Sequence, residues 1–396
     1  MRPIDFLSPW YFSTAYYITF LILSWITVLY HIGSSQQKII RTESSPMQGV
    51  ALLLTLAIAF FIGLRPSNKI FGDMGSYRHT YENVLAGYSP MSLHTEWLWD
   101  NFMYFCKSIG FSSTEFFLMV DIVYFFGMFI CALLLMRKNL WIAMMFFFTA
   151  FSTYSFGTNG IRNGMSSSIE LVAITLLTMG KTKHVLAYIL MFIAFSIHRS
   201  TILPSAAAIA SLYFIKDTKI AIRFWIASIG ISLVAGPMVE QFFAALGFDD
   251  RMSNYASSNR DDSSMEQFSQ SGFRWDFLLY SAAPVAMIWY VTRYRRFTDR
   301  AYIFIANIYL LCNAFWVMVI RSAFSNRFAY LSWFIYPVVM AYPLLRMNIW
   351  KDQDRKTALI FFLYSGFSFF MFFIYYFGTG QGFNGFDQYW WRLNPD

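Results

Sequence analysis

Long apolar stretches recur from one end of this chain to the other, and short polar segments separate them. A helix needs roughly 20 apolar residues to span the hydrocarbon core of a bilayer. Only 13% of the 396 residues are charged, whereas a soluble domain carries about 25%. This pattern excludes a water-soluble globule, a disordered chain and a disulfide scaffold, and it predicts an all-α polytopic membrane protein.

We expect about twelve transmembrane helices, near residues 10–31, 47–64, 114–136, 140–156, 163–180, 185–198, 201–215, 222–245, 275–292, 301–320, 328–345 and 357–378. The pair 185–198 and 201–215 is short for crossing, and only His198, Arg199 and Ser200 separate its members, so it forms either two crossings or a re-entrant hairpin. The remaining length supplies loops but no separate soluble catalytic domain. We therefore predict a single membrane domain over residues 1–396.

The charged residues predict an orientation. When lysine and arginine are assigned to alternate faces, 17 of the 30 basic residues fall on one face, and 17 of the 22 acidic residues fall on the other. By the positive-inside rule the first face is cytoplasmic, and both termini lie outside. The outer face then holds two long segments, residues 65–113 and the polar loop 246–272. Within the first, residues 96–109 have a helix-like aromatic face typical of an interfacial helix.

Several familiar signals of cofactor chemistry are absent from the sequence. The three cysteines are far apart and fit neither a zinc site nor a disulfide framework. No Walker A, Gly-x-Gly-x-x-Gly or His-Glu-x-x-His motif occurs. Asp352 and Asp354 form an Asp-x-Asp, but they lie among basic residues in a predicted cytoplasmic loop. We expect no cofactor, no metal and no nucleic-acid partner.

Six arginines lie at or just inside predicted outer helix ends: Arg65, Arg162, Arg199, Arg274, Arg321 and Arg327. The planar guanidinium grips phosphate or carboxylate with two parallel hydrogen bonds. A lipid-linked diphosphate would lie at the same depth, in the headgroup region of the outer leaflet. The alternative is that these arginines snorkel to the interface or pair with external acids.

Five groups are candidate proton acceptors beside these arginines: Asp73, Glu96, Glu170, His198 and Asp276. Glu170 lies inside a predicted span, where ionisable groups are functional candidates; its alternatives are a polar contact between helices and a structural salt bridge to an arginine such as Arg162. The alternative for Asp276 is an ion pair that orients Arg274. His198 lies at the apex of the broken hairpin, and a neutral imidazole there could take the proton of a sugar hydroxyl. The alternative for His198 is a structural histidine. The identity of the base stays open at this point.

Three segments carry a family resemblance: residues 65–77 (RPSNKIFGDMGSY), 160–173 (GIRNGMSSSIELVA) and 194–204 (AFSIHRSTILP). With them the chain resembles the EpsG family, a Wzy-like group of bacterial polysaccharide polymerases. The residues that match the family pattern are Arg65, Asp73, Tyr77, Arg162, Asn163, His198, Arg199 and Ser200. The chain departs from the pattern at Gly72, which directly precedes Asp73 where the family more often has one residue between them.

The resemblance implies a metal-independent glycosyltransferase of the helical, GT-C-like membrane type. It would join undecaprenyl-diphosphate-linked oligosaccharide repeats on the periplasmic face of the bacterial inner membrane, for an O-antigen, exopolysaccharide or capsule. Tyr77, Asn163 and Ser200 would then contact substrate. Membrane lipid surrounds such an enzyme, and a flippase and a chain-length regulator are expected partners.

Three other functions stay open on the sequence. A ligase would share the diphosphate grip and hand the glycan to another acceptor. A flippase or transporter for the same lipid-linked sugars would favour interrupted helices in two related halves, and the sequence has one broken hairpin without a partner half. A membrane O-acyltransferase would use a histidine as nucleophile or base, and His198 is the one residue that supports this function.

Overall fold

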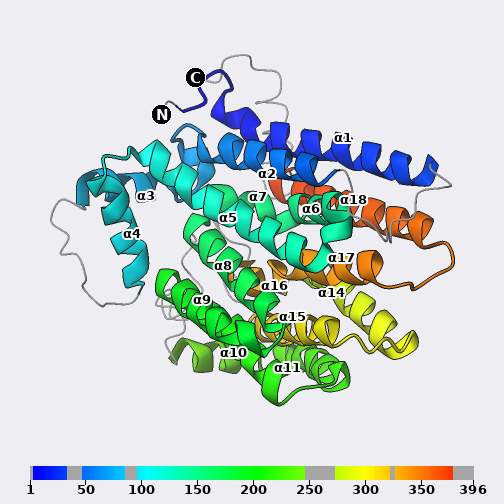
Figure 1. The fold of residues 1–396 in the computed structure, drawn as a ribbon. Helices are drawn as coiled ribbons and strands as arrows, with labels where there is room; N and C mark the ends of the chain where they lie inside the picture. Colours follow the sequence, from blue (N-terminus) through cyan, green and yellow to red (C-terminus); the bar gives the residue numbers. More distant parts are fainter. Residues whose placement is uncertain (1–2, 34–46, 85–95, 246–272, 322–325, 378–396) are drawn as a thin grey trace. The chain divides into compact units, whose positions relative to one another are not determined.

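A computed structural model describes residues 3–33, 47–84, 96–245, 273–321 and 326–377 (Figure 1). These residues form helices and turns, and no strand occurs among them. The prediction of an all-α protein is confirmed. Each of the twelve predicted stretches contains a helix or a pair of short helices. The count of twelve crossings and the GT-C-like architecture stay predictions.

Within the described residues, five segments are long and apolar enough to cross a membrane: Phe12–Tyr30, Ser113–Phe148, Thr218–Gly236, Arg300–Met318 and Phe328–Arg346. A shorter apolar helix covers Gln48–Gly63. These segments support the multi-pass membrane protein predicted from the sequence.

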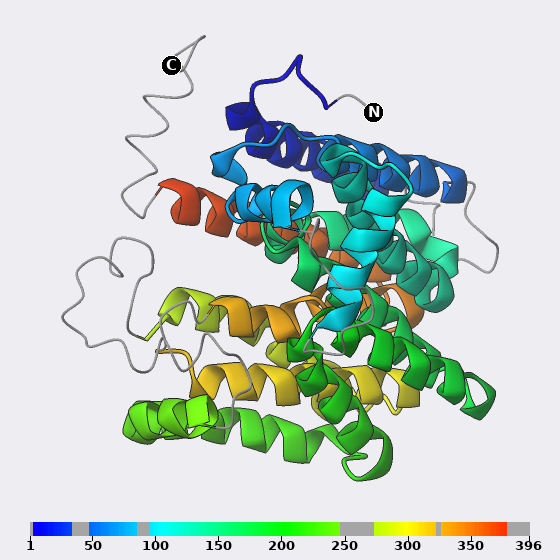
Figure 2. The same ribbon diagram turned by 90° about the vertical axis from the view of Figure 1, so that its left-hand side faces the viewer.

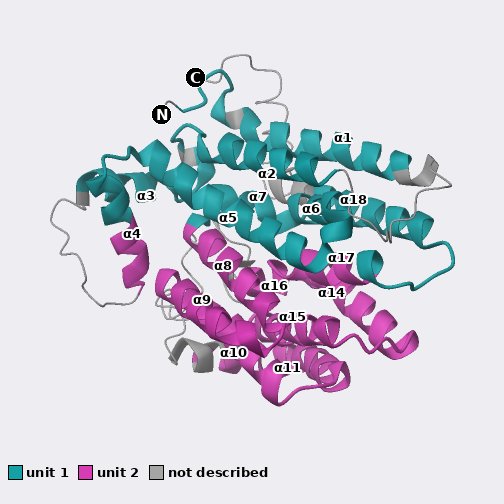
Figure 3. Ribbon diagram, viewed as in Figure 1, with its two compact units in different colours: residues 1–90, 103–161, 344–396 teal, residues 91–102, 162–343 magenta. Residues whose placement is uncertain are grey.

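The chain divides into two compact units (Figure 3). Unit 1 contains Met1–Pro90, Met103–Ile161 and Leu344–Asp396, and unit 2 contains Met91–Phe102 and Arg162–Pro343. The single membrane domain over residues 1–396 stays a prediction. The predicted loop 246–272 lies outside the described residues.

Unit 1 consists mainly of α1 (Phe12–Gly33), α2 (Gln48–Gly63), α3 (Met74–His79), the π-helical turn η3 (Thr80–Val84), the second half of α4 (Trp97–Ser108), α5 (Ser113–Met136), α6 (Leu140–Phe148), α7 (Phe151–Thr158) and α18 (Gln353–Phe377). The end of α2 packs closely on α5, because a Cβ built on Gly63 would lie 2.8 Å from the Cα of Leu118. Buried tyrosines tie other helices together. The hydroxyl of Tyr16 in α1 donates to the carbonyl of Phe148 at 2.7 Å, and that of Tyr364 in α18 donates to the carbonyl of Phe146 at 2.8 Å.

Unit 2 contains the first half of α4, then α8 (Ile161–Leu177), α9 (His184–Ile197), the short turn η7 (Arg199–Thr201), α10 (Ile202–Tyr213), α11 (Thr218–Ala245), α14 (Trp275–Trp289), α15 (Arg300–Met318), α16 (Asn326–Trp333) and most of α17 (Tyr336–Arg346). Figures 1 and 2 show α11 and α15 side by side. Trp225 of α11 donates to the Oδ1 of Asn313 at 2.7 Å, and Asn313 donates to the Oγ of Ser332 at 2.9 Å. Buried polar groups in an apolar interior need such partners.

Two of the predicted continuous spans are interrupted. The stretch 140–156 divides into α6 and α7, and the stretch 328–345 divides into α16 and α17. At the first break, two threonine hydroxyls donate to backbone carbonyls of α6. The hydroxyl of Thr149 donates to the carbonyl of Met145 at 2.7 Å, and that of Thr153 donates to the carbonyl of Phe147 at 2.7 Å. These threonine hydroxyls thus add hydrogen bonds to carbonyls at the end of α6, where the backbone changes direction.

The other local predictions hold more closely. The interfacial helix expected over residues 96–109 is a helix, α4, and its place at the interface stays a prediction. The predicted break at His198 is confirmed, because a helix, a short irregular turn and a second helix follow one another with His198 between α9 and η7; whether the pair crosses the membrane twice or forms a re-entrant hairpin stays a prediction.

Candidate active site

Four of the predicted site residues meet around one carboxylate in unit 2. The Oε1 of Glu96 lies 2.5 Å from the Nδ1 of His198 and accepts the backbone N–H of Arg199 at 3.3 Å. The Oε2 of Glu96 accepts from the Nη1 of Arg162 at 2.6 Å. The structure therefore brings together one acid, one histidine and two arginines from the predicted set, and Glu96 is the centre of this Glu96 cluster.

Local backbone geometry directs these side chains toward each other. Helix α9 ends at Ile197, and His198 adopts an extended conformation with φ −150° and ψ 115°. The next N–H, that of Arg199, belongs to a new helical turn and has no partner within that turn, so it is available to Glu96. Arg162 is the second residue of α8.

The backbone of Glu96 is strained. Its φ is +65°, in the left-handed region that residues with a Cβ rarely adopt. Such a conformation is unfavourable by about 1–2 kcal/mol and persists where surrounding contacts hold it. Here three donors grip the side chain, and α4 begins at the next residue, Trp97. Strain of this kind clusters at functional sites.

The charge state of Glu96 follows from its contacts. Burial alone would raise the pKa of Glu96, but the hydrogen bond and charge of His198, the charge of Arg162 and the N–H of Arg199 outweigh it and lower the pKa to about 2. At neutral pH the carboxylate is ionised and can only accept hydrogen bonds. The Nδ1 of His198 is therefore the donor, and in the neutral form of the ring the lone pair would lie on Nε2.

Two buried donors beside this cluster have no hydrogen-bond partner among the described residues: the Nε of Arg162 and the Oγ of Ser200. Buried polar groups in native structures are paired, so each such group calls for an explanation. Asn163, a third predicted contact, is engaged within α8, where its Oδ1 accepts from Ser167 at 3.1 Å. Hydrogen-bond acceptors that reached these two atoms would satisfy them.

Arg65 lies in the interior of unit 1 with an exposed fraction of 1%. Its Nη1 donates to the carbonyl of Ile62 at 2.7 Å and to the Oδ2 of Asp121 at 2.8 Å, while its Nη2 donates to the carbonyl of Thr158 at 3.1 Å. These bonds join the ends of α2 and α7 to α5. The geometry favours a positioning role for Arg65 over direct contact with a diphosphate.

Asp73 and Tyr77 also belong to unit 1, on the short helix α3. Asp73 is the residue before the first turn of α3, and its backbone N–H donates to the Oδ1 of Asn159 at 2.9 Å. The carbonyl of Asp73 accepts the backbone N–H of Tyr77 at 3.1 Å. In the segment that resembles the family pattern, Asn159 therefore binds the backbone just before α3 begins.

The remaining acids have other partners in unit 2. The Oε1 of Glu170 accepts from the hydroxyl of Ser205 in α10 at 2.8 Å, and its buried Oε2 has no partner among the described residues. The alternative of a polar contact between helices is therefore present for Glu170, and the salt bridge to Arg162 is wrong because Arg162 pairs with Glu96. Asp276 makes a bidentate pair with Arg274, with Nε to Oδ1 at 2.9 Å and Nη2 to Oδ2 at 2.5 Å.

The last three arginines differ in their surroundings. The guanidinium of Arg274, already paired with Asp276, also lies 3.8 Å above the ring of Phe277. Arg321 lies just beyond α15, with its guanidinium 5.9 Å from the ring of Phe273 and no ion pair to any residue that the structure describes. The side chain of Arg327 lies outside the described part of the chain.

Sequence reasoning missed two partners, Asn159 and Ser205, and it did not identify Asp121 as the partner of Arg65. Asn159 precedes Gly160 between two helices, and an Asn-Gly pair is a turn signal that could have identified it. Asp121 and Ser205 are separated from Arg65 and Glu170 by dozens of positions, and no spacing pattern joins them. Among the described residues, no group of three or more metal-ligating side chains occurs.

Comparison with known proteins gives one match. A model of the EpsG family matches residues 50–389. Neither the curated proteins nor the solved structures give a match. The matched region includes Glu96, Arg162, His198, Arg199 and Ser200 and every described helix from α2 onward, apart from the first two residues of α2, whereas α1 lies outside it. The chain therefore belongs to the EpsG family and is a multi-pass membrane protein of the polysaccharide-polymerase type.

Proposed function

We propose that the protein is a polysaccharide polymerase that joins undecaprenyl-diphosphate-linked oligosaccharide repeats on the periplasmic face of the bacterial inner membrane. The observation that carries this proposal is the Glu96 carboxylate, which holds His198 and Arg162 beside two orphaned donors. An enzyme of this kind needs a base for a sugar hydroxyl and cations for a diphosphate. The cluster contains both.

The cations would bind the donor substrate. The diphosphate would accept from the Nε of Arg162 and the Oγ of Ser200, and the side chain of Arg199 would add a second positive charge. Charge that develops on the leaving diphosphate is stabilised best by donors already in place. Because arginines can neutralise this leaving group, the reaction needs neither a metal ion nor a nucleotide.

The imidazole would act on the acceptor substrate. The oxygen of the acceptor hydroxyl forms a bond to the anomeric carbon of the donor, and the bond from that carbon to the diphosphate oxygen breaks. The electron pair leaves with undecaprenyl diphosphate, and the hydroxyl proton moves to the Nε2 of His198. The resulting imidazolium is stabilised by the carboxylate at Nδ1, as in other histidine–carboxylate pairs.

Glu96 is better suited to orienting His198 than to taking the proton itself. With a pKa of about 2 it is a weak base near neutral pH. Its two oxygens are also occupied by three donors. We therefore assign Glu96 as a positioning residue and His198 as the base.

The outlying arginines divide by their charge partners. Asp276 already neutralises Arg274, whereas Arg321 has no ion pair among the described residues. We propose Arg321, with Arg327, as a further ligand for the lipid diphosphate and Arg274 as a structural neighbour. A flippase and a chain-length regulator are the proposed protein partners.

Turnover of the purified protein in nanodiscs tests the function. The substrate is the authentic undecaprenyl-diphosphate repeat, without nucleotide and with EDTA, and the product is read as a ladder on a gel. A ladder that disappears in His198→Ala and Arg162→Ala but persists in His184→Ala supports polymerisation at this site. His184 is a matched control because it lies at the other end of α9, beside Tyr188.

The other functions predict different outcomes of the same experiment. Transfer of one repeat to an added acceptor, without a ladder, would favour the ligase. Movement of the lipid-linked repeat across the membrane, without any glycosidic bond formed, would favour the flippase and contradict the polymerase.

A further inference from the structure

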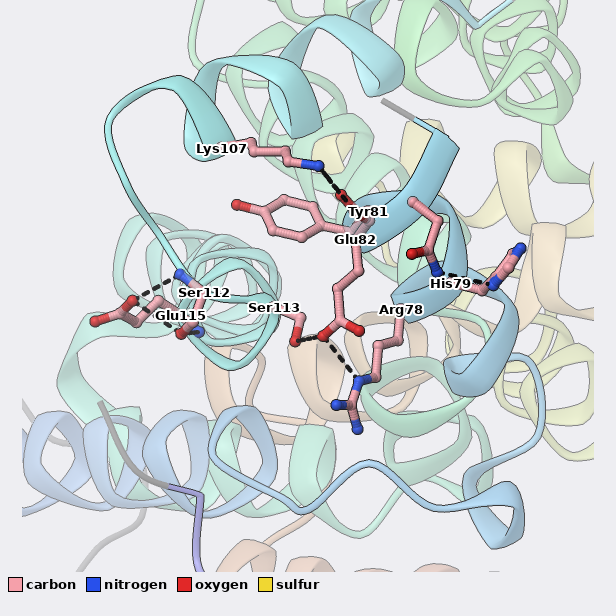
Figure 4. Close-up of polar contacts among 9 residues, drawn as sticks. Arg78, His79, Tyr81, Glu82, Lys107, Ser112, Ser113 and Glu115 are labelled. Atoms are coloured by element: carbon pink, nitrogen blue, oxygen red, sulfur yellow. Dashed lines mark hydrogen bonds and ion pairs between the residues drawn. The ribbon is translucent and has the colours of Figure 1, made fainter. Parts of the chain in front are cut away.

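The C-terminal end of the short helix α3, together with η3, is held by two neighbouring helices of unit 1, α4 and α5 (Figure 4). Lys107 of α4 donates to the carbonyls of Tyr81 and Glu82 at 2.9 and 3.0 Å. The Oε1 of Glu82 accepts from Ser113 of α5 at 2.8 Å and from Arg78 at 2.8 Å. The end of α3 and η3 therefore has little freedom to move.

Tyr81 of η3 adds buried contacts at the same end of α3. Its hydroxyl donates to the carbonyl of Phe111 at 2.9 Å, and its ring stacks on Phe116 with centroids 4.9 Å apart. Tyr81 is 2% exposed. An anchor that combines apolar burial with hydrogen bonds fixes both the position and the rotation of the helix.

The N-terminal end of α3 is held by Asn159. The side-chain oxygen of Asn159 accepts the backbone N–H of Asp73 at 2.9 Å. Gly72 lies directly against the same amide with φ +64°, and a Cβ at this position would lie 2.3 Å from the Asn159 oxygen. Glycine is required here for two reasons: the positive φ and the close approach of the Asn159 amide.

Asn159 is itself well supported. Its own N–H donates to the carbonyl of Ser155 at 2.9 Å, at the end of α7. The carbonyl of the preceding residue, Thr158, accepts from Arg65, which is paired with Asp121. A continuous set of contacts thus connects the buried Arg65 to the backbone of Asp73.

Between these two anchors, α3 presents polar side chains. Asp73 and Tyr77 are half-buried and one helical turn apart, so they share a face, and Ser76 beside them is exposed. The carboxylate of Asp73 makes no cap and no ion pair with any described residue. A Cβ on Gly75 would meet nothing within 4 Å. The chain fixes the backbone of an acid and leaves its carboxylate available.

We propose that this face of α3 binds the hydroxyl groups of the acceptor sugar, with Asp73 and Tyr77 as ligands and Asn159 as the residue that positions Asp73. This inference rests on the proposed function. A carboxylate accepts hydrogen bonds from sugar hydroxyls, and a phenol offers both a polar tip and a flat ring. The same carboxylate repels a diphosphate, so the acceptor end of the substrate fits here and the donor end does not.

The test separates the two substrates. A free repeat oligosaccharide without diphosphate serves only as acceptor, and a lipid-linked repeat whose accepting hydroxyl is methylated serves only as donor. We expect Asp73→Asn and Asn159→Ala to raise the KM for the free repeat about 10- to 100-fold, the range for lost hydrogen bonds to a charged group. The KM for the methylated donor stays within about twofold of the wild-type value.

Two controls separate positioning from folding. Asn83→Ala removes an exposed asparagine whose described contact is with His79 in the same segment, and it leaves both KM values unchanged. In the double variant Asp73→Asn/Asn159→Ala, the acceptor KM equals that of Asp73→Asn alone, because Asn159 acts through Asp73. Equal melting temperatures of the variants show that the loss is not unfolding.

Each outcome bears on one claim. A normal acceptor KM in Asp73→Asn, or full additivity in the double variant, overturns this inference while polymerisation stands. If the native protein forms no product, binding of a fluorescently labelled free repeat tests the sugar surface, that is, the face of α3 with Asp73 and Tyr77. Loss of this binding in Asp73→Asn and Asn159→Ala supports the sugar surface although the polymerase proposal fails. Binding that is unchanged in both variants overturns the sugar surface as well.

Discussion

The Nδ1 of His198 lies 2.5 Å from the Oε1 of Glu96, although 102 sequence positions separate the two residues. One residue follows a helix and the other precedes one, so both lie on irregular backbone. Irregular backbone is tolerated near membrane depth where it lines a cavity or a site. The pair therefore marks the place in unit 2 where we propose that the chemistry occurs.

Replacement of the two members of this pair has graded effects. We expect His198→Ala to lower the rate of polymerisation on the order of 10²- to 10⁴-fold, since that is the contribution of a general base. Glu96→Gln keeps the size of the side chain but removes its charge, so the loss is smaller, on the order of 10²-fold. Single-turnover rates measure both, and equal rates for Glu96→Gln and wild type would contradict the assigned pair.

Arg162→Lys tests the geometry of the donor site. Lysine keeps the positive charge but lacks the planar fork, so it cannot both pair with Glu96 and replace the orphaned Nε. We expect the KM for the lipid-linked donor to rise by about 10-fold or more, with a smaller effect for Arg274→Lys, whose guanidinium is already neutralised. Equal effects of the two changes would refute the division of the arginines.

Arg65 and Asp121 form a buried pair whose disruption affects stability. Arg65→Met leaves the Asp121 carboxylate uncompensated and frees two carbonyls, so unfolding should become easier by about 3–5 kcal/mol. In the double variant Arg65→Met/Asp121→Leu the loss should be smaller than in either single variant, because no lone charge is left buried. Unfolding in a titration with denaturing detergent measures these differences.

Acid should destabilise the Glu96 cluster in a defined pH range. The pKa of Glu96 is lowered from its ordinary 4.5 to about 2, so its stabilising effect is complete above pH 4.5 and is lost as the pH falls toward 2. Wild-type protein should therefore lose more thermal stability between pH 5 and 2 than Glu96→Gln does, because glutamine does not titrate. Melting curves of both proteins across this range provide the test. If the melting temperatures of the two proteins fall equally with pH, the prediction is contradicted.

Two glycines of α2 should respond in opposite directions to alanine. A Cβ at Gly63 would meet the Cα of Leu118 at 2.8 Å, and a backbone atom cannot move aside, so Gly63→Ala should destabilise unit 1 by about 1–3 kcal/mol. A Cβ at Gly49 meets nothing within 4 Å, so Gly49→Ala should be neutral or stabilising by up to about 1 kcal/mol. Thermal unfolding of both variants makes the comparison.

Much of the helical pattern could be predicted from the sequence. Apolar length determines where a membrane helix forms, and Pro, Gly and polar residues mark its ends, so α1, α5, α9 and α15 lie close to the expected ranges. The breaks between α6 and α7 and between α16 and α17 were not predicted. Their positions depend on local hydrogen bonds such as that of Thr153, which hydropathy does not record.

The residue types of the site were also within reach of the sequence, but their pairing was not. Arginines at helix ends, an acid within a span and a histidine in a broken hairpin are visible as patterns, whereas the partner of each is a distant residue. Glu96 was one of five candidate bases on the sequence, and only its three contacts make it the residue that orients His198. On the sequence, Arg65 was one of six arginines at predicted helix ends, and only its burial against Asp121 distinguishes it from the other five.

The sequence by itself determined that this chain is an all-helical membrane protein and which residues resemble the EpsG family, because apolar length and short motifs are local properties. The tertiary structure alone decided that Glu96 meets His198, that Arg65 is buried and that Asn159 holds Asp73. These are contacts between segments far apart in the chain, and they arise from packing, where a few hydrogen bonds and one missing Cβ select among many possible neighbours.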